Sequence, residues 1–201
     1  MNRRAMTKPF AIIAAFFLPL ALAACNNLGP AEKPPLEGAA IGGAFTLTDE
    51  DGKVRHWSDF DGSYRIVYFG YTFCPDVCPT DVAVLSQALT RFEKASPELA
   101  SQVQPLFISI DPARDTPSIL KEFTAAFHPR FLGLTGTPAQ TEEVAKRFAV
   151  FYGKGEETAG GYLMNHSNAA YLFDRKGQPL ALLPMDKGPQ AVEAELAKWV
   201  K

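Results

Sequence analysis

Segments with the composition of β-strands alternate with segments of helical periodicity from residue 44 onward, and this order limits the folds open to the chain. Arg65–Tyr71 and Val103–Ile110 are rich in β-branched and aromatic residues, which predicts buried strands. Apolar residues at helical spacing follow each strand, and Pro79 and Pro117 suit a first helical turn. We expect strands at 45–48, 54–57, 65–71, 103–110, 131–134, 168–173 and 178–183. Helices are expected from about 79, after a cap at Asp115 or Thr116, over 137–150 after a Thr137–Gln140 capping box, and before the C-terminus.

This order predicts an α/β protein. Strands alternating with helices, followed by a hairpin near the end, make a mixed sheet with helices on both faces. A thioredoxin-like fold matches the order, with residues 44–57 added as an N-terminal hairpin around the Asp51-Gly52 turn. With 201 residues, 47% of them apolar, the chain has the size of one globular domain plus a short extension.

Residues 1–24 have the pattern of an export signal. Three basic residues and no acid lie within residues 2–8, before an uncharged run from Phe10 to Ala24. The 15 residues of this run are fewer than the ~20 that a membrane-spanning helix needs. The run leads into Leu22-Ala-Ala-Cys25, which resembles the bacterial lipobox. The resemblance implies a lipoprotein with lipidated Cys25 at its mature N-terminus; an uncleaved membrane anchor is the alternative.

Either outcome places the rest of the chain on the periplasmic side of a bacterial inner membrane, anchored to it. Residues 25–38 contain three prolines and little that is apolar, which predicts an extended tether before a folded domain at 39–201. Without its leader the chain has 17 basic and 22 acidic residues, a formal charge of −5. This acidic balance argues against nucleic acid and anionic lipid as electrostatic partners.

Two cysteines of the domain, Cys74 and Cys78, lie between a predicted strand and a predicted helix start. Unpaired N–H groups and the positive dipole end of a helix N-terminus favour a thiolate, so we expect a lowered cysteine pKa and a nucleophilic, metal-binding pair. Helical side chains four positions apart are about 5–6 Å apart at Cβ, so the two sulfurs can share a metal ion or close a disulfide. A purely structural disulfide is the alternative, but so short a loop gives little entropic stabilisation.

A third ligand has to come from elsewhere in the sequence, which contains three histidines. His56 lies in the first hairpin, and His128 lies at a helix end, where an imidazole can cap carbonyl groups. His166 stands at the end of a loop before a strand, and loops at strand ends are where α/β proteins build their sites. Position favours His166, with capping or solvated roles as the alternative.

Three motifs follow one another over about residues 40–200. They are Phe69-Gly-Tyr-Thr-Phe-Cys74-Pro-Asp-Val-Cys78-Pro79, then Ser109-Ile-Asp111-Pro-Ala-Arg114-Asp115-Thr-Pro117, then His166-Ser167 before a hairpin strand. Their composition and order resemble the signatures of the Sco/SenC family, copper-handling proteins with a thioredoxin fold. Phe73 departs from the polar or histidine residue of many members, and Met164-Asn165 from the acidic residue that often precedes the histidine.

The resemblance implies that Cys74, Cys78 and His166 bind copper. Thiolates suit Cu(I) and imidazole serves Cu(I) or Cu(II), although zinc shares the preference for Cys and His. Met164 is a candidate thioether ligand, and packing is the commoner role of such a methionine. Asp76 and Asp111 are candidates for hydrogen bonds to the ligands, with turn capping as the favoured alternative.

Two functions compete for the same sulfurs. The resemblance implies a metallochaperone that takes copper from a donor protein and delivers it to a respiratory oxidase, at the dinuclear centre of cytochrome c oxidase subunit II. The alternative is an enzyme, a thiol–disulfide reductase in which Cys74 and Cys78 are the redox pair and act on the cysteines of that centre. The Cys-x₃-Cys spacing departs from the Cys-x₂-Cys of dedicated oxidoreductases, and a thiol peroxidase has no sequence sign here.

Tyr152–Tyr162 contains four glycines, three charges and no aliphatic residue other than alanine, which predicts a mobile, exposed loop. Because this segment leads to His166, our hypothesis is that it moves the histidine onto and off the metal.

Overall fold

The computed structural model describes residues 32–159 and 161–201, so the expected export signal and Cys25 lie outside the described residues. Residues Lys33–Lys201 form one compact unit. The strands are β1 (Thr46–Asp49), β2 (Val54–His56), β3 (Tyr64–Gly70), β4 (Val103–Ser109), β5 (Leu132–Thr135), β6 (Tyr152–Thr158), β7 (Gly161–His166), β8 (Ala170–Phe173) and β9 (Pro179–Leu182). The helices are α1 (Val77–Ala95), α2 (Pro97–Ala100), α3 (Pro117–Phe127), α4 (Pro138–Arg147) and α5 (Pro189–Trp199), with 3-10 turns η1 (Trp57–Phe60) and η2 (Met185–Lys187).

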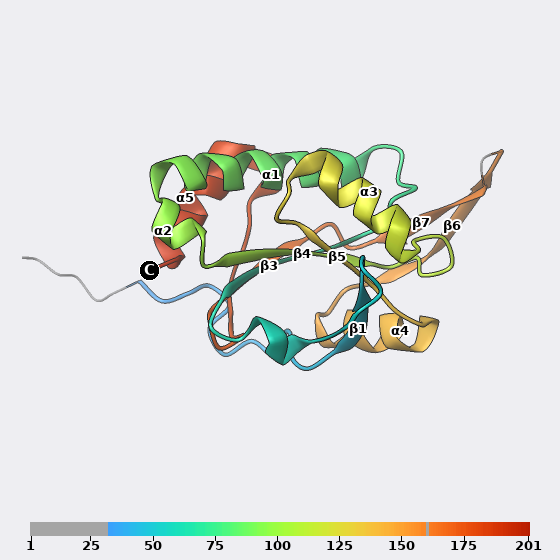
Figure 1. The fold of residues 1–201 in the computed structure, drawn as a ribbon, viewed down its shortest axis with the longest axis horizontal. Helices are drawn as coiled ribbons and strands as arrows, with labels where there is room; N and C mark the ends of the chain where they lie inside the picture. Colours follow the sequence, from blue (N-terminus) through green and yellow to red (C-terminus); the bar gives the residue numbers. More distant parts are fainter. Residues whose placement is uncertain (1–31, 160) are drawn as a thin grey trace, which may run out of the picture. The chain divides into compact units, whose positions relative to one another are not determined.

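A seven-stranded mixed sheet runs through the unit in the order β2-β1-β5-β4-β3-β8-β9. Strands β3, β4 and β5 are parallel, whereas β1, β8 and their outer neighbours pair antiparallel. Helices α1, α3 and α5 cover one face and α4 covers the other (Figure 1). This arrangement confirms the predicted mixed sheet with helices on both faces.

The N-terminal hairpin extends this sheet, because β1 pairs with β2 on one side and with β5 on the other. Its turn is built on Asp49, whose carboxylate accepts hydrogen bonds from the backbone N–H groups of Asp51 (2.9 Å) and Lys53 (2.8 Å). Gly52 has a φ of 80°, a conformation that a side chain would strain.

The helix starts follow from local sequence. Thr116 caps α3 by accepting the Ile119 N–H at 3.4 Å, and Pro117 occupies the first turn. Thr137 and Gln140 form the expected capping box at α4. Helix α1 begins at Val77, two residues before Pro79.

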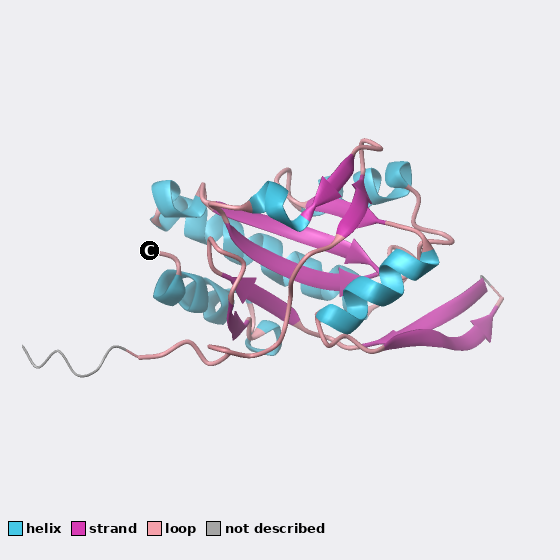
Figure 2. Cartoon of the chain, turned by 90° about the horizontal axis from the view of Figure 1, so that it is seen from below, coloured by secondary structure: helices cyan, strands magenta, loops and turns pink. Residues whose placement is uncertain are grey.

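The loop prediction for 152–162 is wrong. Tyr152–Thr158 and Gly161–His166 are the strands β6 and β7 of a separate two-stranded sheet. The hairpin projects from the end of the unit (Figure 2), and most of its residues are half-buried or exposed. Its backbone groups are satisfied by the partner strand and few of its side chains, among them Tyr152 and Met164, pack against the core, so the sequence lacks the apolar alternation by which strands are recognised.

The core lies on both faces of the central strands, where every residue of β3 is buried. Phe148, at the end of α4, is a hub of this core on one side of the sheet. Its ring centroid lies 5.3 Å from that of Phe69 and 5.5 Å from those of Trp57 and Phe173. This aromatic cluster joins the N-terminal hairpin, α4 and the last hairpin into one unit.

Part of the expected tether packs on the domain. The Leu36 N–H donates to the Leu180 carbonyl at 3.0 Å, and the Leu36 side chain packs against the core. Within residues 32–159 and 161–201 no helix combines the length and the apolarity needed to cross a membrane.

Replacing Phe148 by alanine should lower the free energy of unfolding by about 3–5 kcal/mol, because it removes a fully buried ring and leaves a cavity. Urea unfolding followed by circular dichroism measures the loss. The matched control is Phe151→Ala, whose ring is 68% exposed; its effect should stay within about 0.5 kcal/mol. Equal effects of the two substitutions would contradict the assignment of Phe148 as a hub.

Candidate metal and thiol site

The two cysteines lie where β3 passes into α1. Cys74 belongs to the connecting loop and is half-buried, whereas Cys78 is the second residue of α1 and is fully buried. Neither takes part in a disulfide. Gly70, the last residue of β3, leaves room for this packing, because a Cβ there would stand 3.1 Å from Cys78 Sγ.

The helix N-terminus acts on Cys74 as expected. The backbone N–H of Cys78 donates to Cys74 Sγ at 3.3 Å. The Cys78 thiol and the nearby backbone N–H groups stabilise a thiolate and lower the pKa of Cys74 to about 3, against the opposing effect of burial. The same thiol–thiolate contact, with burial, raises the pKa of Cys78. The pair therefore consists of one thiolate and one thiol.

His166, the last residue of β7, meets this pair from the other side. Its Nε2 lies 3.3 Å from Cys78 Sγ. Its Nδ1 lies 2.9 Å from the Ser167 carbonyl oxygen, which can only accept, so Nδ1 carries the proton and donates. In the neutral ring, Nε2 therefore presents its lone pair to the sulfurs, which is the tautomer that a metal ligand needs.

A buried polar pair lies beneath Cys78. The Tyr68 hydroxyl donates to the Asp81 carboxylate at 3.0 Å. Burial raises the pKa of both Tyr68 and Asp81. The floor of the site is thus polar, and sequence reasoning missed both residues.

The loop that carries Cys74 is held by the second motif. Asp115 is fully buried and accepts hydrogen bonds from the backbone N–H of Thr72 (3.2 Å), the Thr72 hydroxyl (2.7 Å) and the Ser109 hydroxyl (2.6 Å). From its sequence position, Asp115 is expected to cap a helix, whereas its carboxylate fastens the loop of Thr72. Its position in a family signature was the available signal.

The other candidate residues have hydrogen-bond partners away from the sulfurs. His56 is exposed and its Nδ1 lies 3.0 Å from the Thr46 hydroxyl, away from the cysteines. His128 is buried, with its Nε2 3.3 Å from the Glu93 carboxylate and its Nδ1 accepting the Arg130 N–H, so its ring does not cap the α3 carbonyls. Asp111 binds other side chains: its carboxylate accepts from Arg114 Nε and the Tyr162 hydroxyl.

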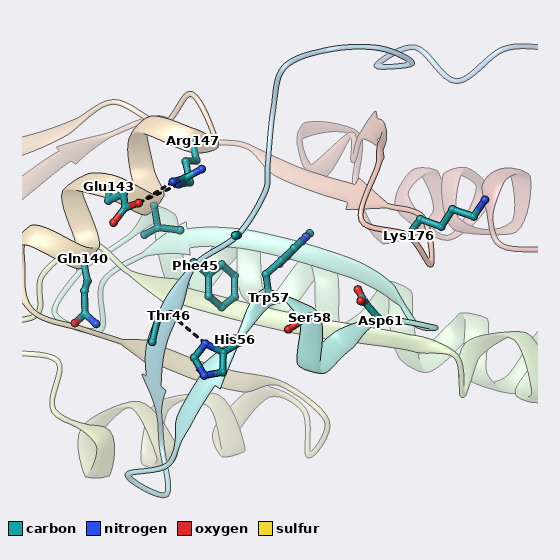
Figure 3. A pocket seen from close by; sticks show the side chains of 12 residues that line it. Phe45, Thr46, His56, Trp57, Ser58, Asp61, Gln140, Glu143, Arg147 and Lys176 are labelled. Carbon is teal, nitrogen blue, oxygen red and sulfur yellow. Dashed lines mark hydrogen bonds and ion pairs between the residues drawn. The ribbon is translucent and has the colours of Figure 1, made fainter.

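A cavity of about 330 Å³ opens beside Cys74 and is also lined by His166, Val77 and Met164, among others. A larger one, of about 580 Å³, lies between β1, η1 and α4 (Figure 3). Its side chains include the Glu143–Arg147 ion pair and His56, but no cysteine. The larger of the two cavities is therefore not the one that contains the reactive side chains.

The three donors lie together without forming a finished metal site. Among residues 32–159 and 161–201 no group of three or more Cys, His, Asp or Glu side chains is arranged at metal-binding distances. A tetrahedral ion with zinc-like bond lengths would separate a sulfur and a nitrogen ligand by about 3.6 Å. The Cys78–His166 contact of 3.3 Å would have to widen by only a few tenths of an ångström.

The model of the SCO1/SenC family matches residues 33–201, which include the whole of this site. The chain belongs to the SCO1/SenC family. A SCO2-like protein of Rickettsia felis is 36% identical over 158 residues, which span 78% of this chain and 75% of that protein.

Solved members of the Sco family share the fold. The copper-bound structure of Bradyrhizobium japonicum ScoI is 37% identical, with a TM-score of 0.72 over 80% of this chain and 99% of that one. The copper-bound structure of Arabidopsis thaliana ScoI is 34% identical, with a TM-score of 0.74 over 79% and 98%. These likenesses confirm the thioredoxin-like fold expected from the sequence.

Alkylation of the reduced protein should reach Cys74 before Cys78, because Cys74 is the half-exposed thiolate. With a pKa of about 3, Cys74 stays ionised at neutral pH, so its alkylation rate should hardly change between about pH 5 and 8. An ordinary thiol would react about tenfold faster per pH unit over that range. Peptide mapping after iodoacetamide pulses measures the rate, and a steep rise at Cys74 would contradict the thiolate assignment.

Proposed function

We propose that this Sco family member is a metallochaperone, anchored on the periplasmic face of the bacterial inner membrane, which carries copper on Cys74, Cys78 and His166. It delivers the ion to the copper site of a respiratory oxidase, in the assembly of cytochrome c oxidase. The observation that carries this proposal is the 3.3 Å contact between Cys78 Sγ and His166 Nε2, across 88 positions of sequence.

The donor set suits copper. Two sulfurs and one imidazole are soft or intermediate ligands, which stabilise Cu(I) and also accept Cu(II). The Nε2 lone pair faces the sulfurs because the Ser167 carbonyl holds the Nδ1 proton. Three protein ligands leave one coordination position open. A receiving protein can bind the ion there before this chain releases it.

The surface around Cys74 suits transfer to a protein. Phe73 is 48% exposed and Val77 41% exposed, and they stand on either side of Cys74 in the sequence. Exposed apolar side chains beside a reactive group mark a surface that a partner covers. The lipid expected on Cys25 would hold this surface near membrane-bound oxidase subunits and raise their effective concentration.

Replacing His166 by alanine should weaken copper binding by more than about a hundredfold, because it removes a whole ligand rather than an outer contact. The measurement is an anaerobic titration of the reduced full-length protein with copper, followed by absorption. The native protein should bind one ion per chain and show a strong sulfur-to-Cu(II) charge-transfer band. The matched control is His56→Ala, which also removes an imidazole but lies away from the sulfurs.

Two results would overturn the metal site. One is a native protein that binds no copper at one equivalent. The other is a His166→Ala protein with native affinity and an unchanged band.

The second candidate function is thiol–disulfide reduction of the cysteines at the oxidase copper site. It is favoured by the pairing of a thiolate, Cys74, with a neighbouring thiol, Cys78, since one can attack a disulfide and the other can resolve the mixed disulfide. His166 separates the two functions, because thiol exchange does not need a third ligand. If His166→Ala abolishes copper binding while oxidase assembly in cells stays normal, the reductase is the working function.

A further inference from the structure

The position of His166 depends on a hairpin that has little support from the rest of the protein. Strands β6 and β7 pair with each other and, in the described part of the chain, with no strand of the seven-stranded sheet. The hairpin projects away from the sheet (Figure 2). His166 is the last residue of β7 and lies opposite Tyr152 in the ladder. Contacts between β7 and the rest of the protein therefore decide where the imidazole stands.

The first of these contacts is a polar and aromatic clamp on Tyr162. The Tyr162 hydroxyl donates to Asp111 Oδ1 at 2.8 Å, and Arg114 Nε donates to Oδ2 of the same carboxylate at 2.5 Å. The Arg114 guanidinium also lies over the Tyr162 ring, 3.8 Å from its centroid. Asp111 is buried, so its charge is held in a medium where a hydrogen bond to it is strong.

The second contact lies closer to the metal ligands. The Met164 N–H donates to the Tyr71 hydroxyl at 3.2 Å, and the Tyr71 ring meets the His166 ring edge-on with centroids 6.0 Å apart. Residues 162, 164 and 166 lie on one side of β7, because side chains alternate along a strand. The clamp and the ligand therefore share one face of the same strand.

We propose that Tyr162, held by Asp111 and Arg114, is a positioning residue that fixes His166 against the cysteines and sets how long the histidine stays on bound copper. This inference rests on the proposed function of the site. It assigns a role to the second motif: Asp115 holds the loop of Cys74, and Asp111 with Arg114 holds the strand of His166. One short segment after β4 thus aligns both halves of the site.

The hydroxyl of Tyr162 is the atom to remove. Tyr162→Phe deletes the hydrogen bond to Asp111 but keeps the ring beneath Arg114 and keeps the β6–β7 ladder. The matched control is Tyr152→Phe, which makes the same chemical change on the same hairpin, opposite His166, at a tyrosine that takes no part in the clamp. Asp111→Asn is a second route to the same weakening, because it removes the charge that the hydroxyl binds.

The experiment loads each full-length protein with one equivalent of Cu(II) and mixes it with excess chelator in a stopped-flow spectrometer. Decay of the sulfur-to-Cu(II) charge-transfer band gives the dissociation rate. Because a hydrogen bond to a charged group is lost, Tyr162→Phe and Asp111→Asn should each dissociate about tenfold or more faster than the native protein. Tyr152→Phe should stay within about twofold. Tyr162→Phe and Asp111→Asn weaken the same interaction, so the double variant should release copper no faster than either single variant.

A second readout separates positioning from a general loss of stability. Hydrogen exchange of the metal-free protein should speed up at amides 161–166 in Tyr162→Phe and stay unchanged in the core strands β3 and β4. Native dissociation rates in Tyr162→Phe and Asp111→Asn, with fast dissociation in His166→Ala, would overturn the clamp and leave the proposed function standing. A native rate and band in His166→Ala would instead overturn the proposed function.

Discussion

The site depends on one contact, the approach of His166 Nε2 to Cys78 Sγ at 3.3 Å. Cys78 and His166 are 88 positions apart in the sequence, so no local feature of the chain brings them together. Cys78 is placed by the central parallel strands and the buried start of α1, and His166 by a hairpin outside the main sheet. Any change that moves the hairpin relative to α1 opens the site without touching its sulfurs.

The rest of the fold holds the two cysteines more firmly than it holds His166. The sulfur half stands on a fully buried strand, with Asp115 fastening its loop and the Tyr68–Asp81 pair beneath it. The histidine half is held by the contacts that β7 makes with Tyr71, Asp111 and Arg114. A carrier benefits from this difference, because a ligand that moves without unfolding the core can admit and release an ion. The same sulfurs, with one ionised and one protonated, also retain the chemistry of a thiol exchanger.

The sequence alone predicted the parts that follow from local rules. The caps at Thr116 and Thr137, the buried strands and the sulfur pair at a helix start depend on neighbouring residues and were found where expected. The β6–β7 hairpin was missed because it pairs without burying a face. Asp111 and Asp115 were undervalued because their partners, Tyr162 and Thr72, lie 51 and 43 positions away, and a single sequence gives no signal for such pairs.

The coordination of bound copper tests the central claim most directly. X-ray absorption at the copper edge, on the native full-length protein loaded with one ion, reports which atoms surround the metal. The expected spectrum contains two sulfur scatterers and one nitrogen scatterer with the outer-shell pattern of an imidazole ring. A copper ion surrounded by sulfur and water oxygen alone would show that the late histidine is not a ligand, and would contradict the account.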